Sequence, residues 1–352
     1  MSHVRLLCVM LLAGTVAGVS TAPADTDARP PHLHRYKLKN LVLEPRSDDP
    51  SAYDSWKVEC PMVIRDGDRW LMYYSAITRT DGKADSTIAV AESTDLIHWT
   101  RLQMVLPRGR AGEFDHGGVS GPFVWKEGDR FFMIYPGFPT LGYETWPGKH
   151  GLATSTDGLT WTRSPHNPIH GPGAPGSWND AIVYKAFVLK RDGTYWMFYN
   201  AKGHEQRNEQ IGLATSDDLV HWTQHPANPL IRAGDPEKDR DHRIIADPWI
   251  MRRDGIWEMY YFAFDGRNAR EHLATSHDLI HWTKSPYNPI MDAGPPGSYD
   301  DIHCHKPSIV EHEGVIYHFY TACASRPDGD GEYRAIALAT SVKLPGVAYR
   351  DD

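Results

Sequence analysis

The sequence has few cysteines and no excess of basic residues, and both shortages exclude classes of protein. Four of its 352 residues are cysteine, and 37 Lys and Arg face 45 Asp and Glu, giving a formal net charge of −8. Four cysteines are too few for a disulfide-framework protein. A nucleic-acid-binding chain needs a basic face that displaces phosphate counterions. We therefore expect no nucleic-acid partner.

Long apolar runs are also scarce, and the run at the start is typical of a secretory signal peptide. Arg5 precedes the apolar residues 6–19, and Ala-Pro-Ala at 22–24 offers a cleavage site. The run is too short to span a membrane. We expect residues 1–24 to be removed, leaving a secreted or periplasmic monomer with no membrane partner. An odd number of cysteines then remains, which allows at most one disulfide: Cys60, Cys304 and Cys323.

Aromatic residues and glycine are abundant by contrast, with 12 Trp, 17 Tyr and 30 Gly, and they belong to an internal repeat. A segment of the form Ala-x-Ser-x-Asp-x-x-x-Trp-Thr occurs four times at intervals of about 60 residues. Its tryptophans are Trp99, Trp161, Trp222 and Trp282. A truncated fifth copy starts at Ala339, and an aromatic strand preceded by a Gly turn lies before each copy. Four strands in about 60 residues are typical of a propeller blade.

The sequence therefore predicts an all-β fold, a five-bladed β-propeller with four antiparallel strands per blade, over residues 37–345. Helices should be nearly absent. The fifth copy lacks an outer strand, and we expect residues 38–43 to supply it, so that an N-terminal strand closes the ring. Residues 25–36 are predicted to be a flexible N-terminus and residues 346–352 a C-terminal tail.

Features present in every repeat are predicted to be scaffold. The Asp of each Ser-x-Asp segment should accept hydrogen bonds from backbone N–H groups of its turn. The inner strands can be aligned at one shared position, occupied by Pro61, Pro122, Ala186, Pro248 and Pro307. A second set of polar residues lies seven positions before this shared position, and we expect these residues to fasten loops. They are Asp54, Asp115, Asn179, Asp241 and Asp300.

Residues that differ between the repeats are predicted to line the central channel, because the inner strands of a propeller face its axis. One position before the shared one are Cys60, Gly121, Lys185, Asp247 and Lys306. Two positions before it are Glu59, Ser120, Tyr184, Ala246 and His305. Six positions before it are Ser55, His116, Asp180, His242 and Asp301. Buried charges are costly unless they pair or bind something. The cluster is therefore either a buried Lys185–Asp247 salt bridge or a functional site.

This pattern resembles the five-bladed propeller glycosidases, the group that contains glycoside hydrolase families 32, 43, 62, 68, 117 and 130. The resemblance lies in the repeated units, in the Asn-Pro segments at 167, 228 and 288, and in Asp247-Pro248 of the fourth inner strand. It implies a secreted glycoside hydrolase that uses one carboxyl group as an acid and another as a nucleophile or base. The catalytic candidates are Glu59, Asp180 and Asp247.

The resemblance also implies a carbohydrate substrate held at the mouth of the channel. The candidate binding residues are His116, Lys185, Asp301, His303, His305, Lys306, Arg267 and Trp146. The two lysines would suit a carboxylate or sulfate on the sugar, so an acidic or sulfated glycan fits. His303 and His305 on one strand face would only start a zinc site, so we predict no cofactor and keep a structural or site metal ion as the alternative. A mouth closed by loops such as residues 137–150 would favour cleavage at chain ends.

Two alternatives stay open on the sequence alone. A non-catalytic carbohydrate-binding propeller would have the same fold, although it would not need carboxylates that face one another across the mouth. A glycoside phosphorylase or transglycosylase could use the two lysines to hold phosphate. A sialidase is disfavoured, because that class has six blades and an arginine triad.

Overall fold

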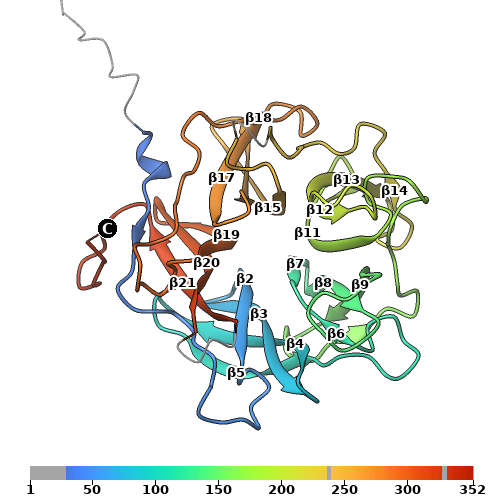
Figure 1. Cartoon of the computed structure of the whole chain (residues 1–352), viewed down its shortest axis with the longest axis horizontal. Coiled ribbons are helices and arrows are strands. Elements are labelled where there is room, and N and C mark those ends of the chain that lie inside the picture. Colours follow the sequence, from blue (N-terminus) through green and yellow to red (C-terminus); the bar gives the residue numbers. More distant parts are fainter. Residues whose placement is uncertain (1–28, 236–238, 327–330, 352) are drawn as a thin grey trace, which may run out of the picture.

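Five blades of antiparallel strands surround a central axis in the computed structural model, which describes residues 29–235, 239–326 and 331–351 (Figure 1). Strand pairing groups these blades into four sheets, because a parallel bridge from Ala269 to His303 joins the last two blades. Apart from one short 3₁₀ turn, η1 (Pro31–Leu33), the described residues contain strands and loops. None of their helices is long and apolar enough to cross a membrane. The all-β propeller fold is thus confirmed. The predicted signal peptide lies outside the described residues.

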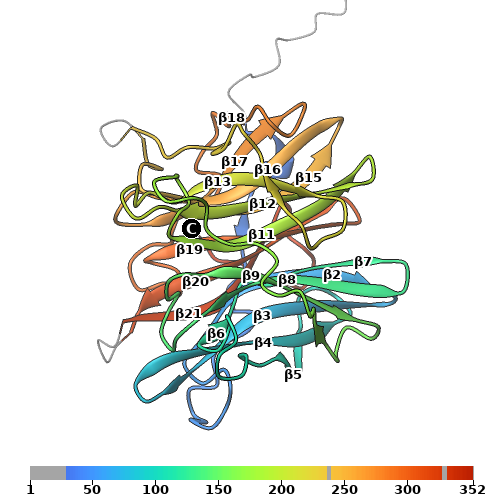
Figure 2. The same cartoon turned by 90° about the vertical axis from the view of Figure 1, so that its right-hand side faces the viewer.

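The strands follow the sequence repeats. The strands nearest the axis in Figure 1 are β2, β7, β11, β15 and β19, and Figure 2 shows the same strands from the side. Blade 1 contains β2 (Lys57–Asp66), β3 (Arg69–Thr80), β4 (Lys83–Ser93) and β5 (Thr100–Leu106). Blade 2 contains β6 (Gly118–Val119), β7 (Phe123–Glu127), β8 (Arg130–Phe138), β9 (Lys149–Ser155) and β10 (Thr162–Arg163).

The remaining three blades have the same order of strands. Blade 3 contains β11 (Ile182–Arg191), β12 (Thr194–Lys202), β13 (Gln210–Ser216) and β14 (Thr223–Gln224). Blade 4 contains β15 (Ile244–Arg253), β16 (Ile256–Phe264), β17 (Ala269–Ser276) and β18 (Thr283–Lys284). Blade 5 contains β19 (His303–His312), β20 (Val315–Ser325), β21 (Glu332–Thr340) and β1 (Tyr36–Lys37).

The N-terminal segment supplies the outer strand of blade 5. Tyr36 of β1 pairs with Thr340 of β21, and Ile336 exchanges backbone hydrogen bonds with residues 42 and 43. The predicted outer strand from the N-terminus is therefore confirmed, although it lies at Tyr36–Lys37 and the expected residues 38–43 add only isolated bridges at Leu38 and Leu43. Residues 25–28 of the predicted flexible N-terminus lie outside the described residues, and in the described part that follows them the Arg29 guanidinium donates to the carbonyl oxygen of Ile290 at 2.9 Å. At the other end Arg350 Nη1 lies 2.6 Å from Asp300 Oδ1, so both described ends pack on the propeller.

The polar residues shared by the repeats are scaffold, as predicted. Asp54 is fully buried and accepts from Arg101 Nε at 2.9 Å and from the Tyr74 hydroxyl at 3.4 Å. The same carboxylate–cation pairing occurs in other blades, in Asp115–Arg163, Asp241–Lys284 and Asp300–Lys37. Each cation lies on the outer strand of its own blade. The pair therefore ties the loop before the inner strand to the outer edge.

The Ser-x-Asp segments form identical turns. Asp95 Oδ1 accepts the backbone N–H groups of Ile97 and His98 at 2.9 and 2.8 Å, and the Trp99 indole N–H donates to the carbonyl oxygen of Leu96 at 3.1 Å. The second, third and fourth copies repeat these bonds. The Asp in this motif is thus occupied by its turn and is not available for chemistry.

Candidate active site

In four of the blades a β-bulge on the inner strand turns one side chain toward the axis. Pairing with the second strand shifts register around residues 60–61, 184–185, 247–248 and 306–307. In blade 2 the strand is interrupted instead, between β6 and β7, where Gly121 lies. Backbone φ is positive at Cys60 (53°), Gly121 (48°), Asp247 (57°) and Lys306 (64°). Bulges re-aim side chains, and positive φ in residues other than glycine is typical of functional sites.

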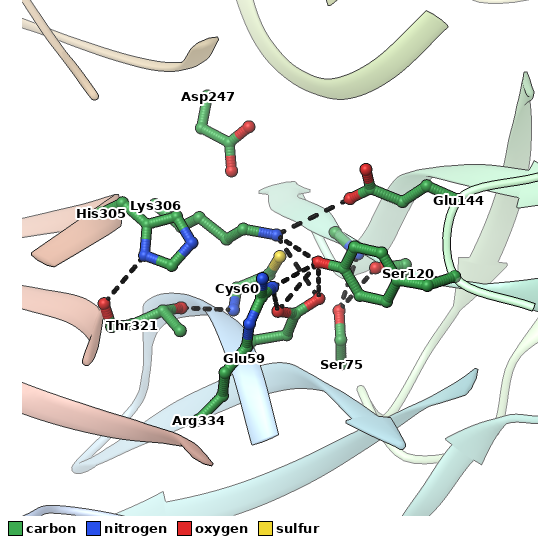
Figure 3. Close-up of polar contacts among 12 residues, drawn as sticks. Glu59, Cys60, Ser75, Ser120, Glu144, Asp247, His305, Lys306, Thr321 and Arg334 are labelled. Atoms are coloured by element: carbon green, nitrogen blue, oxygen red, sulfur yellow. Dashed lines mark hydrogen bonds and ion pairs between the residues drawn. The ribbon is translucent and has the colours of Figure 1, made fainter. Parts of the chain in front are cut away.

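The five residues singled out at this position all border one pocket of about 200 Å³ on the axis. Three carboxyl groups line it, those of Glu144, Glu209 and Asp247. Three cationic side chains line it as well: Lys185, Lys306 and Arg334. Figure 3 shows Asp247, Lys306 and Glu144 around the centre of this pocket, with Glu59 and Arg334 to one side.

Asp247 is buried without a matching partner. It is 5% exposed, and its Oδ2 accepts no hydrogen bond from any described residue. Lys185 is 3% exposed, and its ammonium donates to the carbonyl oxygen of Pro307 at 3.5 Å. No ion pair within 4.0 Å joins Lys185 to Asp247, so the buried salt bridge considered from the sequence does not form. Burial raises the pKa of Asp247, while the charges of Lys185 and Lys306 oppose that rise.

Glu144 and Glu209 have raised pKa values for related reasons. Burial, together with the nearby Glu209 and Glu59 and against the charge of Lys306, raises the pKa of Glu144 to about 7. Burial also raises the pKa of Glu209, although Lys202 Nζ and Asn200 Nδ2 each donate to its carboxylate at 3.2 Å. The pocket therefore holds carboxyl groups with raised pKa values beside positive charges that favour ionisation, and the pKa of Glu144 lies near neutral pH.

Glu59 lies behind the pocket wall rather than in the pocket. It is 0% exposed, and the hydroxyl of Tyr143 donates to both of its oxygens, at 2.9 and 3.1 Å. Arg334 donates to it as well, and Lys306 Nζ lies 3.4 Å from it (Figure 3). Although burial alone would raise its pKa, Lys306 and Arg334 lower it to about 2. Glu59 is thus an ionised carboxylate whose contacts hold three lining residues in place.

Four of the predicted binding residues border the pocket: Lys185, Lys306, His303 and His305. His303 Nε2 lies 3.3 Å from Glu332 Oε1, and His305 Nδ1 is 3.0 Å from the carbonyl oxygen of Thr321. In the described part of the chain, no group of three His, Cys, Asp or Glu residues could hold a metal ion. Cys60, Cys304 and Cys323 are buried free thiols.

The loop residues six positions before the shared one lie outside the pocket, which corrects the placement of Asp180, Asp301 and His116. Both oxygens of Asp180 accept backbone N–H groups, from Gly176 and His204, each at 2.7 Å. These bonds lower the pKa of Asp180. Asp301 accepts the corresponding N–H of Gly297 at 2.9 Å. Asp301 thus fastens its own loop, and Asp180 joins its loop to the connection between β12 and β13.

Two further predicted binding residues are also outside the lining. Arg267 is exposed in the turn before β17, where its backbone N–H donates to Asp265. Trp146 is 39% exposed and lies above the rim, with its ring edge-on to that of His204 at 5.3 Å.

The sequence comparison between repeats missed Glu144, Glu209 and Arg334. Two of these could have been found by extending the same comparison to the third strand of each blade. The position five residues before the Ala of the repeated segment holds Ser86, Gly148, Glu209, Ala269 and Arg334. Glu144 lies in a loop without a counterpart in the other blades, so the repeat gives no register for it.

Comparison with known proteins agrees with this architecture. Residues 54–225 match the glycosyl hydrolases family 32 N-terminal domain. The solved structure of BT0996 in a complex with RGII superposes with a TM-score of 0.72 and 28% identity, covering 88% of this chain and 93% of that one. The match thus extends over nearly the whole propeller.

Two curated proteins match over shorter parts. Protein Rv1502 of Mycobacterium tuberculosis, itself uncharacterized, is 25% identical over 266 residues, 73% of this chain and 84% of that protein. The insoluble β-fructofuranosidase isoenzyme CWINV5 of Arabidopsis thaliana is 30% identical over 186 residues, 47% of this chain and 31% of the plant enzyme.

Proposed function

Because the chain belongs to the five-bladed β-propeller glycoside hydrolase superfamily, we propose that it hydrolyses glycosidic bonds in the central pocket. One observation carries this proposal. A carboxyl group with a pKa of about 7, that of Glu144, shares the pocket with the buried Asp247, which has an oxygen free of hydrogen bonds. Glycoside hydrolysis needs one protonated acid and one carboxylate that faces the sugar.

Glu144 is the proposed general acid. Its raised pKa keeps a large fraction protonated near neutral pH, and general acids work best when their pKa is close to the working pH. It also lies in a loop at the rim, where a leaving group can depart into solvent.

Asp247 is the proposed nucleophile or base. The positive charges of Lys185 and Lys306 favour its ionised form, and its bulge turns it toward the axis. Glu209 lies with Glu144 and Asp247 in the same lining and is proposed to bind sugar hydroxyls and to raise the pKa of Glu144.

Lys185 also supports an anionic substrate. Its buried ammonium contacts only one carbonyl oxygen among the described residues, at the outer limit of hydrogen bonding. A carboxylate or sulfate on the sugar would accept hydrogen bonds from this ammonium, which has the longer-range charge of Asp247 beside it. We extend the proposal to an acidic glycan, and to action outside the cytoplasm after removal of residues 1–24.

The test is a panel of aryl glycosides, neutral and acidic, incubated with wild type, Asp247→Asn and Asp180→Asn. The two variants carry the same chemical change on an aspartate inside and outside the pocket. We expect wild type to release a sugar and Asp247→Asn to lose at least about 1,000-fold in kcat. Asp180→Asn should retain activity within a few-fold. Equal loss in both variants, or no sugar released from the panel, would contradict the proposal.

A further inference from the structure

Blade 2 carries a long connection beside the pocket, and two of its residues, Tyr143 and Glu144, line the pocket. Residues 139–148 join β8 to β9, and we call them the strap. The equivalent connections between the second and third strands are shorter, at 81–82 in blade 1, 203–209 in blade 3, 265–268 in blade 4 and 326–331 in blade 5. An insertion in one repeat lies on the face where its loops emerge, which is often the binding face.

One part of the strap is fastened to blades 1 and 5. The backbone N–H of Gly142 donates to the carbonyl oxygen of Ala84, next to the start of β4, at 2.9 Å. The hydroxyl of Tyr143 then reaches Glu59 on β2, and it accepts a hydrogen bond from Lys306 on β19 at 3.1 Å. Arg334 on β21 donates to the same hydroxyl. A single phenol therefore connects blade 2 to two other blades.

The other part of the strap leans on blade 3. The ring of Trp146 meets that of His204 edge-on, and Lys202 Nζ lies 5.6 Å from the centre of the Trp146 ring. The outer faces of Tyr143 and Trp146 are open to solvent, with 38% and 39% of each residue exposed. The strap thus spans from blade 5 to blade 3 and forms an outer rim.

The pocket under the strap is small. Its volume of about 200 Å³ is below the roughly 300–1,000 Å³ of pockets that take drug-sized ligands. Tyr143 and Glu144 of the strap are part of its wall. From this volume we expect the pocket to hold about one sugar ring, with the Tyr143 side chain in its wall obstructing an internal stretch of a glycan chain.

We infer that the enzyme acts at chain ends, removing one sugar at a time from the non-reducing end, and that Tyr143 determines this specificity. The inference rests on the proposed hydrolase function. The bond that is cleaved lies on the aglycone side of the ring in the pocket, so a pocket that admits one ring releases the terminal sugar. Tyr143 acts by holding the strap against blades 1 and 5.

The experiment uses the mature protein and the sugar identified on the aryl glycoside panel. Two oligosaccharides of that sugar are compared, one with a free non-reducing end and one whose terminal ring is blocked at its hydroxyl groups. We expect wild type to release only monosaccharide from the free oligosaccharide and to leave the blocked one intact. Tyr143→Ala should raise the ratio of blocked to free cleavage at least tenfold.

Two further variants separate specificity from stability. Tyr143→Phe keeps the ring and removes only the hydroxyl, so it should raise the same ratio by a smaller factor. Tyr333→Ala, which removes a tyrosine of β21 whose hydroxyl binds Glu44 at 2.7 Å, should keep the wild-type ratio. A merely structural role for Tyr143 would lower both cleavage rates in proportion and leave the ratio unchanged.

The outcomes also distinguish the two proposals. Wild type that hydrolyses an aryl glycoside and also cuts the blocked oligosaccharide internally would overturn the chain-end inference and leave the hydrolase standing. Failure to hydrolyse any aryl glycoside would overturn the hydrolase and the inference with it.

Discussion

The proposed role of Glu144 predicts a particular pH dependence. Partial burial of its side chain, which is 28% exposed, together with the nearby Glu209 and Glu59, moves its pKa from the ordinary value of 4.5 to about 7. A general acid works in its protonated form, so kcat/KM should fall as the pH rises through 7. Relative to the acidic plateau, we expect about half of the activity at pH 7 and about one tenth at pH 8.

The variant Glu144→Gln tests this directly, because glutamine has nearly the same shape and donates no catalytic proton. General acid catalysis contributes about 100- to 10,000-fold, so hydrolysis of an aryl glycoside with a poor leaving group should fall by that factor. A dinitrophenyl glycoside, whose leaving group departs without a proton, should lose far less. The decline near pH 7 should disappear in this variant.

Glu209→Gln is the matched control, since Glu209 borders the same pocket and also has a raised pKa. Without the nearby negative charge, the pKa of Glu144 should fall and the decline should move to lower pH. If the decline near pH 7 persists in Glu144→Gln and vanishes in Glu209→Gln, the acid is Glu209 and the assignment to the strap is refuted.

Two further predictions concern Lys185 and the scaffold. Lys185→Met removes a charge that favours ionised Asp247, so the pKa of Asp247 should rise and the acidic limb of the kcat/KM profile should shift to higher pH by about one unit. Lys190→Met, at the exposed end of the same strand, should leave this limb at the same pH. Asp54→Asn breaks a buried ion pair with Arg101 and should lower the free energy of unfolding by about 3 kcal/mol in denaturant titrations. Asp192→Asn, on an almost fully exposed side chain, should change it by less than about 0.5 kcal/mol.

The fold could be predicted from the sequence because its determinants are repeated. The Asp95 turn and the Trp99 contact recur in four copies, so each copy tests the interpretation of the others. The outer strand from the N-terminus was also predictable, since the fifth copy ends without its own. The anchoring of Arg29 was not, because carbonyl oxygens of blade 4 receive it and the sequence does not reveal backbone acceptors.

The site was predictable only where the backbone repeats. Asp247 and Lys306 were found because a bulge recurs at their position and turns each of them to the axis. Asp180 was misplaced although it is only five residues from Lys185. Its loop folds back, and its carboxylate binds the backbone N–H of Gly176. Counting residues from a lining position therefore predicts where a side chain points only within the inner strand, and not in the loop before it.

Glu59 shows why a charged residue on an inner strand is not necessarily catalytic. It precedes the bulge at Cys60, and its side chain reaches the wall between blades 1 and 5 instead of the pocket. There its carboxylate accepts hydrogen bonds from Arg334 and from the hydroxyl of Tyr143, and it lies 3.4 Å from Lys306 Nζ. A carboxyl group with a pKa of about 2 is ionised near neutral pH, so it has no proton to donate as a general acid.

Different positions of the repeat serve stability and the pocket, which explains how one propeller can have both a stable ring and an acidic pocket. Stability depends on Asp54 and its counterparts, which pair with cations on the outer strands, away from the axis. The bulge belongs to the backbone pattern, so the side chain it presents is not needed for strand pairing. Asp247 and Lys185 can therefore lie buried and unpaired there, a costly arrangement that a bound sugar would relieve. Substitutions at the bulge should consequently affect activity more than folding, and substitutions at the outer pairs should do the reverse.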